Sequence, residues 1–159
     1  MIDELVQKIL NAEKESMKKL QTLQKEIEKQ KGLRILTGVN NLQLAPNFNL
    51  REFGCKGGDN CCGGAVKFDP ELIRRLQKMR DELKAPIRIA SGFRCPDYNK
   101  RVGGVTNSYH LRGQAVDIKS NVPMERLYAL AEKYFEDGGI GKYETFVHVD
   151  TGTKRRWFG

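Results

Sequence analysis

The chain contains two histidines, and each of them adjoins a segment that is typical of a β-strand. His110 precedes the alternating segment 114–118, which contains Asp117, and His148 lies within the strand-like segment 146–150. Two imidazoles and one carboxylate are a suitable ligand set for a catalytic zinc ion that keeps one coordination position open. Pairing these two segments as antiparallel neighbours would bring the three side chains within reach of one ion.

The rest of the pattern predicts an α+β fold, with a small antiparallel sheet flanked by helices and one long helix before it. Asp69, Pro70 and Glu71 form a clear helix start, because they combine a cap, a proline in the first turn and an acid at the positive end of the helix dipole. The segments expected in the body are a short helix start at 49–53, a helix at 70–84, strands at 86–91 and 114–118, a helix at 123–136, and last strands of which 146–150 is the clearest.

Residues 3–31 carry apolar residues at helical spacing between many Lys and Glu residues, and Gly32 is a plausible stop. The domain boundaries that follow are an N-terminal amphipathic helix at 1–32 and a catalytic domain at 33–159, which begins with a linker that contains a short strand at 33–36. The helix could pack on the body, self-associate as a coiled coil, or dock on a wall or partner protein.

Composition and charge limit the classes of partner that the chain is expected to bind. A hydrophobic fraction of 39% with 30% charged residues fits a soluble globular protein, and the formal charge is +8. A basic body suits an acidic cell wall or a nucleic acid, or it serves solubility alone, and no nucleic-acid-reading motif is present. We find no secretory signal and no apolar run long enough to span a membrane, so we expect synthesis in the cytoplasm.

Five motifs resemble those of the zinc D-Ala-D-Ala carboxypeptidase family, peptidase family M15. They are Ser91-Gly92-Phe93-Arg94, Tyr98-Asn99, Val102-Gly103-Gly104, Ser108-x-His110-x-x-Gly113-x-Ala115-x-Asp117 and His148-x-Asp150. The resemblance covers about residues 42–158 and is closest to small phage or prophage endolysin peptidases. It implies a D-Ala-D-Ala carboxypeptidase/hedgehog-like fold, one zinc ion per chain held by His110, Asp117 and His148, and bacterial peptidoglycan peptides as substrate.

The same resemblance places Arg94 in the catalytic pocket. A guanidinium there could hold a substrate carboxylate or stabilise the oxyanion of a tetrahedral intermediate, and the structural alternative is an ion pair with Asp97 or another carboxylate. Ser108 and Tyr109 flank the first ligand and are candidates for substrate binding, although a serine there could equally fix the turn.

The general base is the point at which the chain departs from the family. Better-known members have an acid three residues before the second histidine ligand, where this chain has Thr145. Glu144 is our first candidate for the base and Asp150 our second, since residues 144 and 150 share a face of the expected strand with His148. Asp150 could instead orient His148 or Arg94.

Four cysteines form a separate group, with Cys55, Cys61 and Cys62 in one glycine-rich loop and Cys95 next to Arg94. They lack the usual C-x2-C spacing of zinc sites. We expect structural thiols, or a disulfide that ties the loop to Cys95, ahead of a second zinc ion. Near the end of the chain, Trp157 and its basic neighbours either contact a wall polymer or close the core.

These features together predict a zinc metallopeptidase that hydrolyses stem or cross-link peptides of peptidoglycan, as a carboxypeptidase or an endopeptidase. We expect a phage or prophage lysis enzyme that acts on the wall after release from the cytoplasm. The alternative is a non-catalytic zinc-binding module of the same fold, which Thr145 keeps open. Neither reading fixes the bond that is cut.

Overall fold

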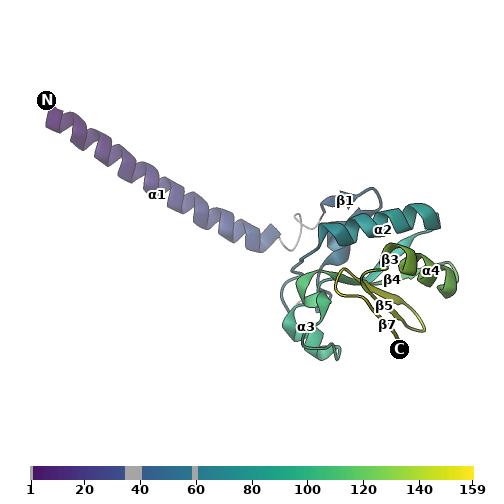
Figure 1. Cartoon of the computed structure of the whole chain (residues 1–159). Helices are drawn as coiled ribbons and strands as arrows, with labels where there is room; N and C mark the ends of the chain where they lie inside the picture. Colours follow the sequence, from purple (N-terminus) through teal and green to yellow (C-terminus); the bar gives the residue numbers. More distant parts are fainter. Residues whose placement is uncertain (1, 35–40, 59–60) are drawn as a thin grey trace.

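The computed structural model describes residues 2–34, 41–58 and 61–159, and within the first helix it describes the side chains of residues 4–23. Figure 1 shows the long first helix and the α+β body. The elements are, in order, α1 (Ile2–Arg34), β1 (Gln43–Ala45), β2 (Phe48–Asn49), η1 (Leu50–Phe53), α2 (Pro70–Leu83), β3 (Ile87–Ser91), α3 (Pro96–Arg101), η2 (Tyr109–Arg112), β4 (Ala115–Ser120), α4 (Met124–Tyr134), β5 (Gly139–Lys142), β6 (Val147–Asp150) and β7 (Arg155–Phe158).

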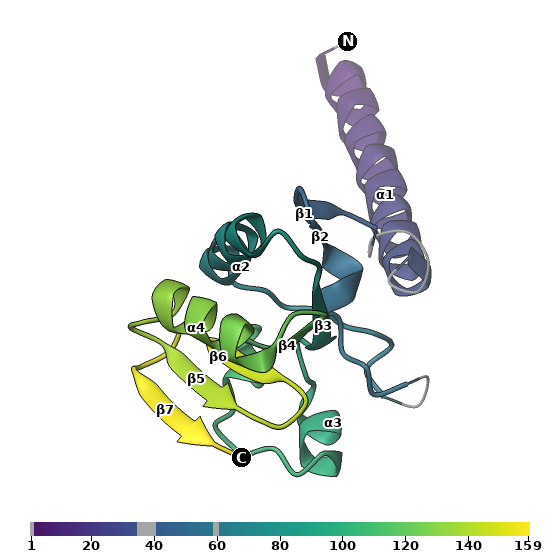
Figure 2. The ribbon, with the colours of Figure 1, turned by 90° about the vertical axis from the view of Figure 1, so that its right-hand side faces the viewer.

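The main sheet has the strand order β3-β4-β6-β5-β7, and β1 pairs with β2 in a separate hairpin (Figure 2). The neighbours β3, β4, β6 and β5 are antiparallel as expected, whereas β5 and β7 are parallel, which makes the sheet mixed. The parallel pair follows from the order of pairing. Because β4 and β5 occupy both edges of β6, the strand that returns after β6 cannot pair with β6 itself; it joins the sheet beside β5, where it runs in the same direction as β5.

The helices α2 and α4 cover one face of the sheet, while α3 lies away from them (Figures 1 and 2). The helix start expected at residue 69 is present, since the side chain of Asp69 caps Glu71 and Pro70 is the first helical residue. The main core between helices and sheet is built from Phe48, Phe53, Leu72, Ile73, Leu76, Met79, Leu83, Ile87, Ile89, Val116, Ile118, Leu127, Ala131, Phe135, Ile140, Val147 and Val149. Burial of these side chains supplies the main favourable free energy of folding.

The alternation of side chains along β4 and β6 separates the core from the other face of the sheet. Val116 in β4 and Val149 in β6 point into the core. The residue next to each of them in its strand therefore points to the opposite face of the sheet. On that face one cross-strand row runs through the whole sheet, and it consists of Ser91, Asp117, His148, Gly141 and Trp157. Two of the three expected metal ligands are therefore direct neighbours in this row.

Three local expectations differ from the structure. The first helix continues to Arg34, so Gly32 does not end it, and the short strand expected at 33–36 falls partly on this helix and partly outside the described residues. The passage 92–107, for which we expected no regular element, contains α3, which Cys95 caps and Pro96 begins.

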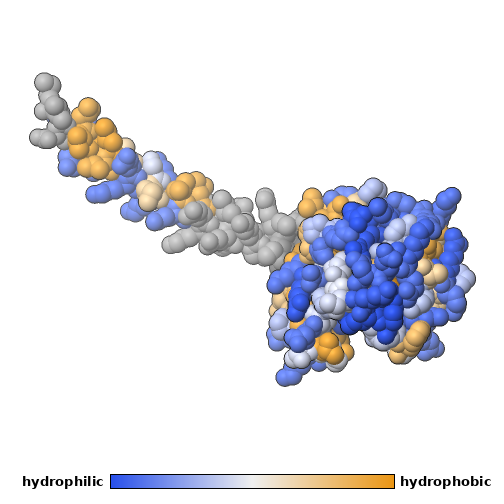
Figure 3. Space-filling view, viewed as in Figure 1, coloured by the Kyte–Doolittle hydropathy of each residue, from blue (hydrophilic) through white to orange (hydrophobic). Residues whose placement is uncertain are grey.

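The described side chains of α1 are exposed throughout, which excludes packing of residues 4–23 on the body. Figure 3 shows hydrophobic side chains along this helix. They include Leu5, Val6, Ile9, Leu10, Met17, Leu20 and Leu23. Self-association or docking through this stripe stays a prediction. Within the described residues, no helix combines the length and the apolar composition that crossing a membrane requires.

Gly113 follows the turn that carries His110, and it packs against the residues that precede α2. Its replacement gives a direct test of the packing around the site. Gly113 has φ of 72°, and a Cβ atom built on it would lie 2.4 Å from the backbone of Lys67. Gly103, with φ of 71°, has no atom within 4 Å of such a Cβ. Gly103→Ala should therefore cost about 1 kcal/mol for backbone strain alone, whereas Gly113→Ala should cost about 2–4 kcal/mol because a steric clash is added. Urea unfolding of both variants measures the difference, and equal losses would contradict the close packing at Gly113.

Candidate metal centre

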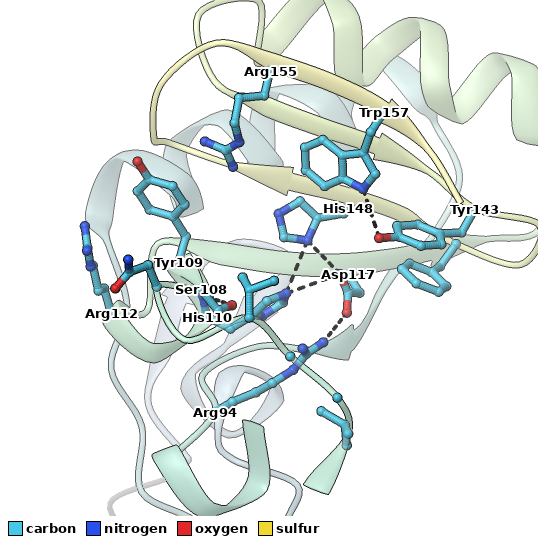
Figure 4. Close-up of a pocket in the computed structure, with 16 residues that line it drawn as sticks. Arg94, Ser108, Tyr109, His110, Arg112, Asp117, Tyr143, His148, Arg155 and Trp157 are labelled. Atoms are coloured by element: carbon cyan, nitrogen blue, oxygen red, sulfur yellow. Dashed lines mark hydrogen bonds and ion pairs between the residues drawn. The ribbon is translucent and has the colours of Figure 1, made fainter. Parts of the chain in front are cut away.

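Three donor atoms from three elements converge on the open face of the sheet (Figure 4). They are Nε2 of His110 in η2, Oδ1 of Asp117 in β4 and Nδ1 of His148 in β6. Nδ1 of His148 lies 3.2 Å from Nε2 of His110 and 2.9 Å from Oδ1 of Asp117. The third separation, between Nε2 of His110 and Oδ1 of Asp117, is 3.3 Å.

These separations fit one tetrahedral metal ion. Nitrogen and oxygen ligands about 2.0–2.1 Å from a zinc ion are about 3.3 Å from one another in a tetrahedron. The three observed separations of 2.9–3.3 Å are close to that value. Three protein donors leave a fourth position free, which is the arrangement of catalytic zinc sites rather than of closed structural ones.

Each histidine is held by a hydrogen bond from its other ring nitrogen. Nδ1 of His110 lies 2.7 Å from the carbonyl oxygen of Gly92, and Nε2 of His148 lies 3.0 Å from Oδ2 of Asp150. Because a carbonyl or carboxylate oxygen accepts the ring proton, the nitrogen that faces the centre is left with its lone pair. The structure therefore holds both imidazoles in the tautomer that binds a metal.

Asp150 is fully buried behind His148, and its carboxylate has several partners besides the imidazole. Its Oδ1 accepts hydrogen bonds from the backbone N–H groups of Gly139 at 3.0 Å and Gly152 at 2.8 Å, and Arg155 pairs with Oδ2. Burial alone would raise the pKa of Asp150, but hydrogen bonding with His148 and Gly152 lowers it below its ordinary value. The structure places Asp150 where it can orient His148, one of the two roles considered for it.

The carboxylate of Asp117 divides its two oxygens between the centre and Arg94. Oδ1 faces the histidines, and Oδ2 accepts a hydrogen bond of 2.6 Å from Nη2 of Arg94, whose Nε donates to Oγ of Ser91 at 2.8 Å. Burial by itself would raise the pKa of Asp117, but the hydrogen bonds with both histidines hold it well below its usual range. The carboxylate is therefore ionised, and the partner of Arg94 is Asp117 rather than Asp97.

Ser108 and Glu144 have clear positions. The Oγ of Ser108 accepts from the backbone N–H of His110 at 3.3 Å and so fixes the turn that carries this ligand. Glu144 and Thr145 form the exposed tip of the β5–β6 hairpin, which the hydrogen bond from Tyr143 N to Phe146 O closes at 3.0 Å. Glu144 is not among the residues that line the cavity over the centre.

The three donors open into a cavity of about 760 Å³ with basic and aromatic walls. Tyr109 lies between the guanidinium groups of Arg112 and Arg155, which are 5.3 and 4.8 Å from its ring centroid. The lining residues are Arg94, Val102, Gly103, Gly104, Val105, Asn107, Ser108, Tyr109, His110, Arg112, Asp117, Tyr143, Phe146, His148, Arg155 and Trp157.

Sequence reasoning missed the aromatic wall beside His148. Trp157 lies next to His148, with ring centroids 5.1 Å apart, and its Nε1 donates to the hydroxyl of Tyr143 at 2.9 Å. A side chain on Gly141 would collide with the indole, because its Cβ would lie 2.4 Å from Trp157. Gly141, which lies opposite both His148 and Trp157, is the sequence signal that could have indicated this wall. The signal can be used only if the pairing of β7 with β5 is already known.

Replacing Asp150 tests its role as the group that orients His148. Asp150→Asn should weaken zinc binding about 10- to 100-fold, because the charge that orients the imidazole and increases its basicity is lost. Competition against a chromophoric chelator measures the affinity. Asp97→Asn, the same exchange at an exposed position of α3, is the control and should bind zinc as the unmodified chain does. Equal affinities of the two variants would show that Asp150 does not support the metal centre.

Comparisons with known proteins agree with this geometry. The model of the family described as Peptidase M15 matches residues 46–150, a range that contains all three donor residues. The chain is 34% identical over 152 residues to the peptidoglycan L,D-endopeptidase MepK of Escherichia coli strain K12, and this match covers 78% of the chain and 80% of that protein.

A second relative is a probable peptidoglycan L,D-endopeptidase MepK of Haemophilus influenzae, with 35% identity over 104 residues. That match covers 58% of this chain and 55% of the Haemophilus protein, so the chain spans about half the length of this relative. The family resemblance carried by the sequence motifs is thereby confirmed, and the chain belongs to peptidase family M15.

Proposed function

We propose that this chain is a zinc peptidase that hydrolyses peptides of bacterial peptidoglycan, with the specificity of an L,D-endopeptidase. The observation that carries the proposal is the convergence of His110, Asp117 and His148 at one cavity, at separations suited to a single ion. Membership of the M15 family supports peptide hydrolysis, and the names of the two MepK relatives support the substrate and the L,D bond.

The three donors would hold zinc, which when bound supplies Lewis acidity to a peptide carbonyl and to the attacking water. The chain supplies the fixed geometry around that position. The carbonyl of Gly92 and the carboxylate of Asp150 hold the two imidazoles, and Arg94 holds Asp117 so that a single oxygen faces the centre. Such preorganisation avoids rearrangement of the site when a substrate binds.

Arg94 and Tyr143 are the groups that we propose to contact the substrate near the reacting carbonyl. Within the described residues, Nη1 of Arg94 has no hydrogen-bond partner, although the guanidinium lines the cavity. The hydroxyl of Tyr143 accepts a hydrogen bond from Trp157 and keeps its own proton available for donation. Both groups can therefore donate to an oxygen that gains negative charge during hydrolysis.

The walls of the cavity suit a peptide that carries carboxylates. Arg112 and Arg155 present guanidinium groups on both sides of Tyr109, and guanidinium groups bind carboxylates through paired hydrogen bonds. Peptidoglycan stem peptides carry free carboxylates along their length. We propose that Tyr109 and its two arginines receive such a carboxylate and that Ser108 acts through the turn of His110.

The proton from the attacking water needs an acceptor. Asp150 is already bonded to His148, to two backbone N–H groups and to Arg155, so we propose it as a positioning residue. Glu144 remains our proposed base, because it follows Tyr143, which lines the cavity, although Glu144 itself lies at the exposed hairpin tip outside the lining. Its carboxylate would have to reach the substrate from that hairpin tip.

One observation favours the second candidate, a non-catalytic zinc-binding module. Within the described part of the chain, Asp117 is the only carboxylate that lines the cavity. Turnover separates the two candidates, since a module would bind walls without cutting them. A carboxypeptidase specificity, a phage or prophage origin, and action on the wall after release from the cytoplasm stay predictions from the sequence.

Defined muropeptides test the reaction and its specificity. The zinc-loaded chain should cut a stem peptide at an L,D bond, and the products should disappear with a chelator and in His110→Ala, which lacks one of the three donors. Mass spectrometry of the fragments identifies the bond. Release of terminal D-Ala alone would replace the endopeptidase proposal by a carboxypeptidase, and intact peptides with tightly bound walls would favour the non-catalytic module.

Tyr143→Phe tests the proposed hydrogen-bond donor. Loss of one donor to the developing oxyanion should lower kcat by about 10²-fold while zinc content stays unchanged. Tyr134→Phe is the matched control, because the hydroxyl of Tyr134 donates to Glu82 on the helical side of the molecule and does not line the cavity. If both variants kept the full kcat, Tyr143 would have no part in the chemistry.

A further inference from the structure

A second cluster of metal-binding side chains lies outside the cavity. The Sγ atoms of Cys55, Cys61, Cys62 and Cys95 all lie within 4.8 Å of one another, and none of the four cysteines is in a disulfide. Sγ of Cys61 is 2.9 Å from that of Cys95 and 3.9 Å from that of Cys55. Three of these residues are close in sequence, and the fold brings the fourth to them from the start of α3.

We propose that these four cysteines hold a second zinc ion, which is structural. Four thiolates about 2.3 Å from a zinc ion are about 3.8 Å from one another in a tetrahedron. The separation of 3.9 Å between Cys55 and Cys61 is close to that value, and the separation of 2.9 Å between Cys61 and Cys95 is shorter than it but longer than a disulfide bond of about 2.05 Å. Four protein ligands leave no position open, which distinguishes such a site from the centre at His110. The chain would then carry two zinc ions rather than the one expected from its resemblance to the family.

The loop around the cluster explains why a metal is needed there. The described residues between η1 and α2 contain no helix or strand, and the loop includes Gly54, Gly57, Gly58, Gly63 and Gly64. Its buried residues form only a small group with Phe93, separate from the main core. A long loop without regular structure has little apolar surface to bury, and binding of a metal can supply the missing free energy of folding.

Local contacts fit sulfur ligands. The backbone N–H of Tyr98 donates to Sγ of Cys95 at 3.4 Å, a bond that stabilises a thiolate. Gly57 lies against the cluster, since a Cβ atom there would be 2.4 Å from Sγ of Cys61 and 2.8 Å from the guanidinium of Arg101. Arg101 donates to the carbonyl of Gly57 at 2.8 Å, which places a positive charge beside a site whose four thiolates and zinc together carry a negative charge.

The segment 92–95 connects this cluster to the catalytic centre. The carbonyl of Gly92 orients His110, Arg94 binds Asp117, and Cys95 is part of the cluster. The segment is also tied by backbone hydrogen bonds, from Phe93 N to Phe53 O at 2.8 Å and from Arg94 N to His110 O at 3.1 Å. A metal at the cysteines would therefore fix one end of the segment that positions two groups of the catalytic centre.

A disulfide is the competing account of the same cysteines. One disulfide between the loop and Cys95 would use two of the four sulfur atoms and would leave the other two as thiols beside it. The mutual approach of all four sulfur atoms to within 4.8 Å is required by a shared metal ion but not by one disulfide. The geometry therefore favours the metal.

Zinc counting in single-site variants tests the proposal without use of enzyme activity. Protein purified with a thiol reductant and without chelator should contain two zinc ions per chain by elemental analysis. His110→Ala and Cys95→Ser should each contain one, and the double variant should contain none. Cobalt substituted into His110→Ala should give the intense ligand-field and sulfur-to-metal charge-transfer absorption of a tetrathiolate site, whereas Cys95→Ser should lack it.

A second measurement uses the unmodified chain, so that misfolding of a cysteine variant cannot decide the outcome. Titration with an organic mercurial, which displaces zinc from thiolates, should release one zinc ion per chain to a colorimetric chelator while the second ion stays bound. One zinc ion in the unmodified chain and none in His110→Ala would overturn the proposal, as would a disulfide found among these cysteines by non-reducing mass spectrometry. Loss of peptidase activity with two zinc ions still bound would count against the proposed function and not against this site.

Discussion

The carboxylate of Asp117 is the group on which both the site and the arrangement of the surrounding elements depend. It is buried, and an ionised carboxylate in that position costs several kcal/mol unless partners compensate it. Those partners come from three different places, with His110 in η2, His148 in β6 and Arg94 in the segment after β3. The buried charge is therefore fully compensated only when these three parts have assembled around β4.

Much of this arrangement could be predicted from the sequence, because its signals are local. Asp69 and Pro70 predict the start of α2, and β-branched residues at every second position predict β4 and β6. Residues of the same strand that alternate with those apolar positions must point to the other face, so the convergence of Asp117 and His148 could be predicted once the two strands were assumed to pair. The motif Ser108-x-His110 of the family added His110 to this pair of residues, and the structure places its ring beside them.

The parts that escaped prediction depend on contacts between distant residues or on the end of a strand. Glu144 was assigned to a strand face, but the β5–β6 hairpin turns at residues 144 and 145, so the alternation that holds from Val147 onward does not reach it. The place of Trp157 in the cavity depends on β7 joining the far edge of the sheet, which no local pattern indicates. Contact between Cys95 and the loop was among the expectations, in the form of a disulfide, but the cysteine spacing gave no sign that all four sulfur atoms would meet as free thiols.

Metal binding at this site depends on the register of the strands, because two of the three donors lie in one cross-strand row. The row contains Ser91, Asp117, His148, Gly141 and Trp157. A slip of one residue between β4 and β6 would turn a ligand into the core and a valine into solvent, because side chains alternate with a period of two. A misaligned molecule could not assemble the three donors. Metal binding would therefore stabilise only molecules whose strands are in the native alignment, and misaligned molecules would stay without metal.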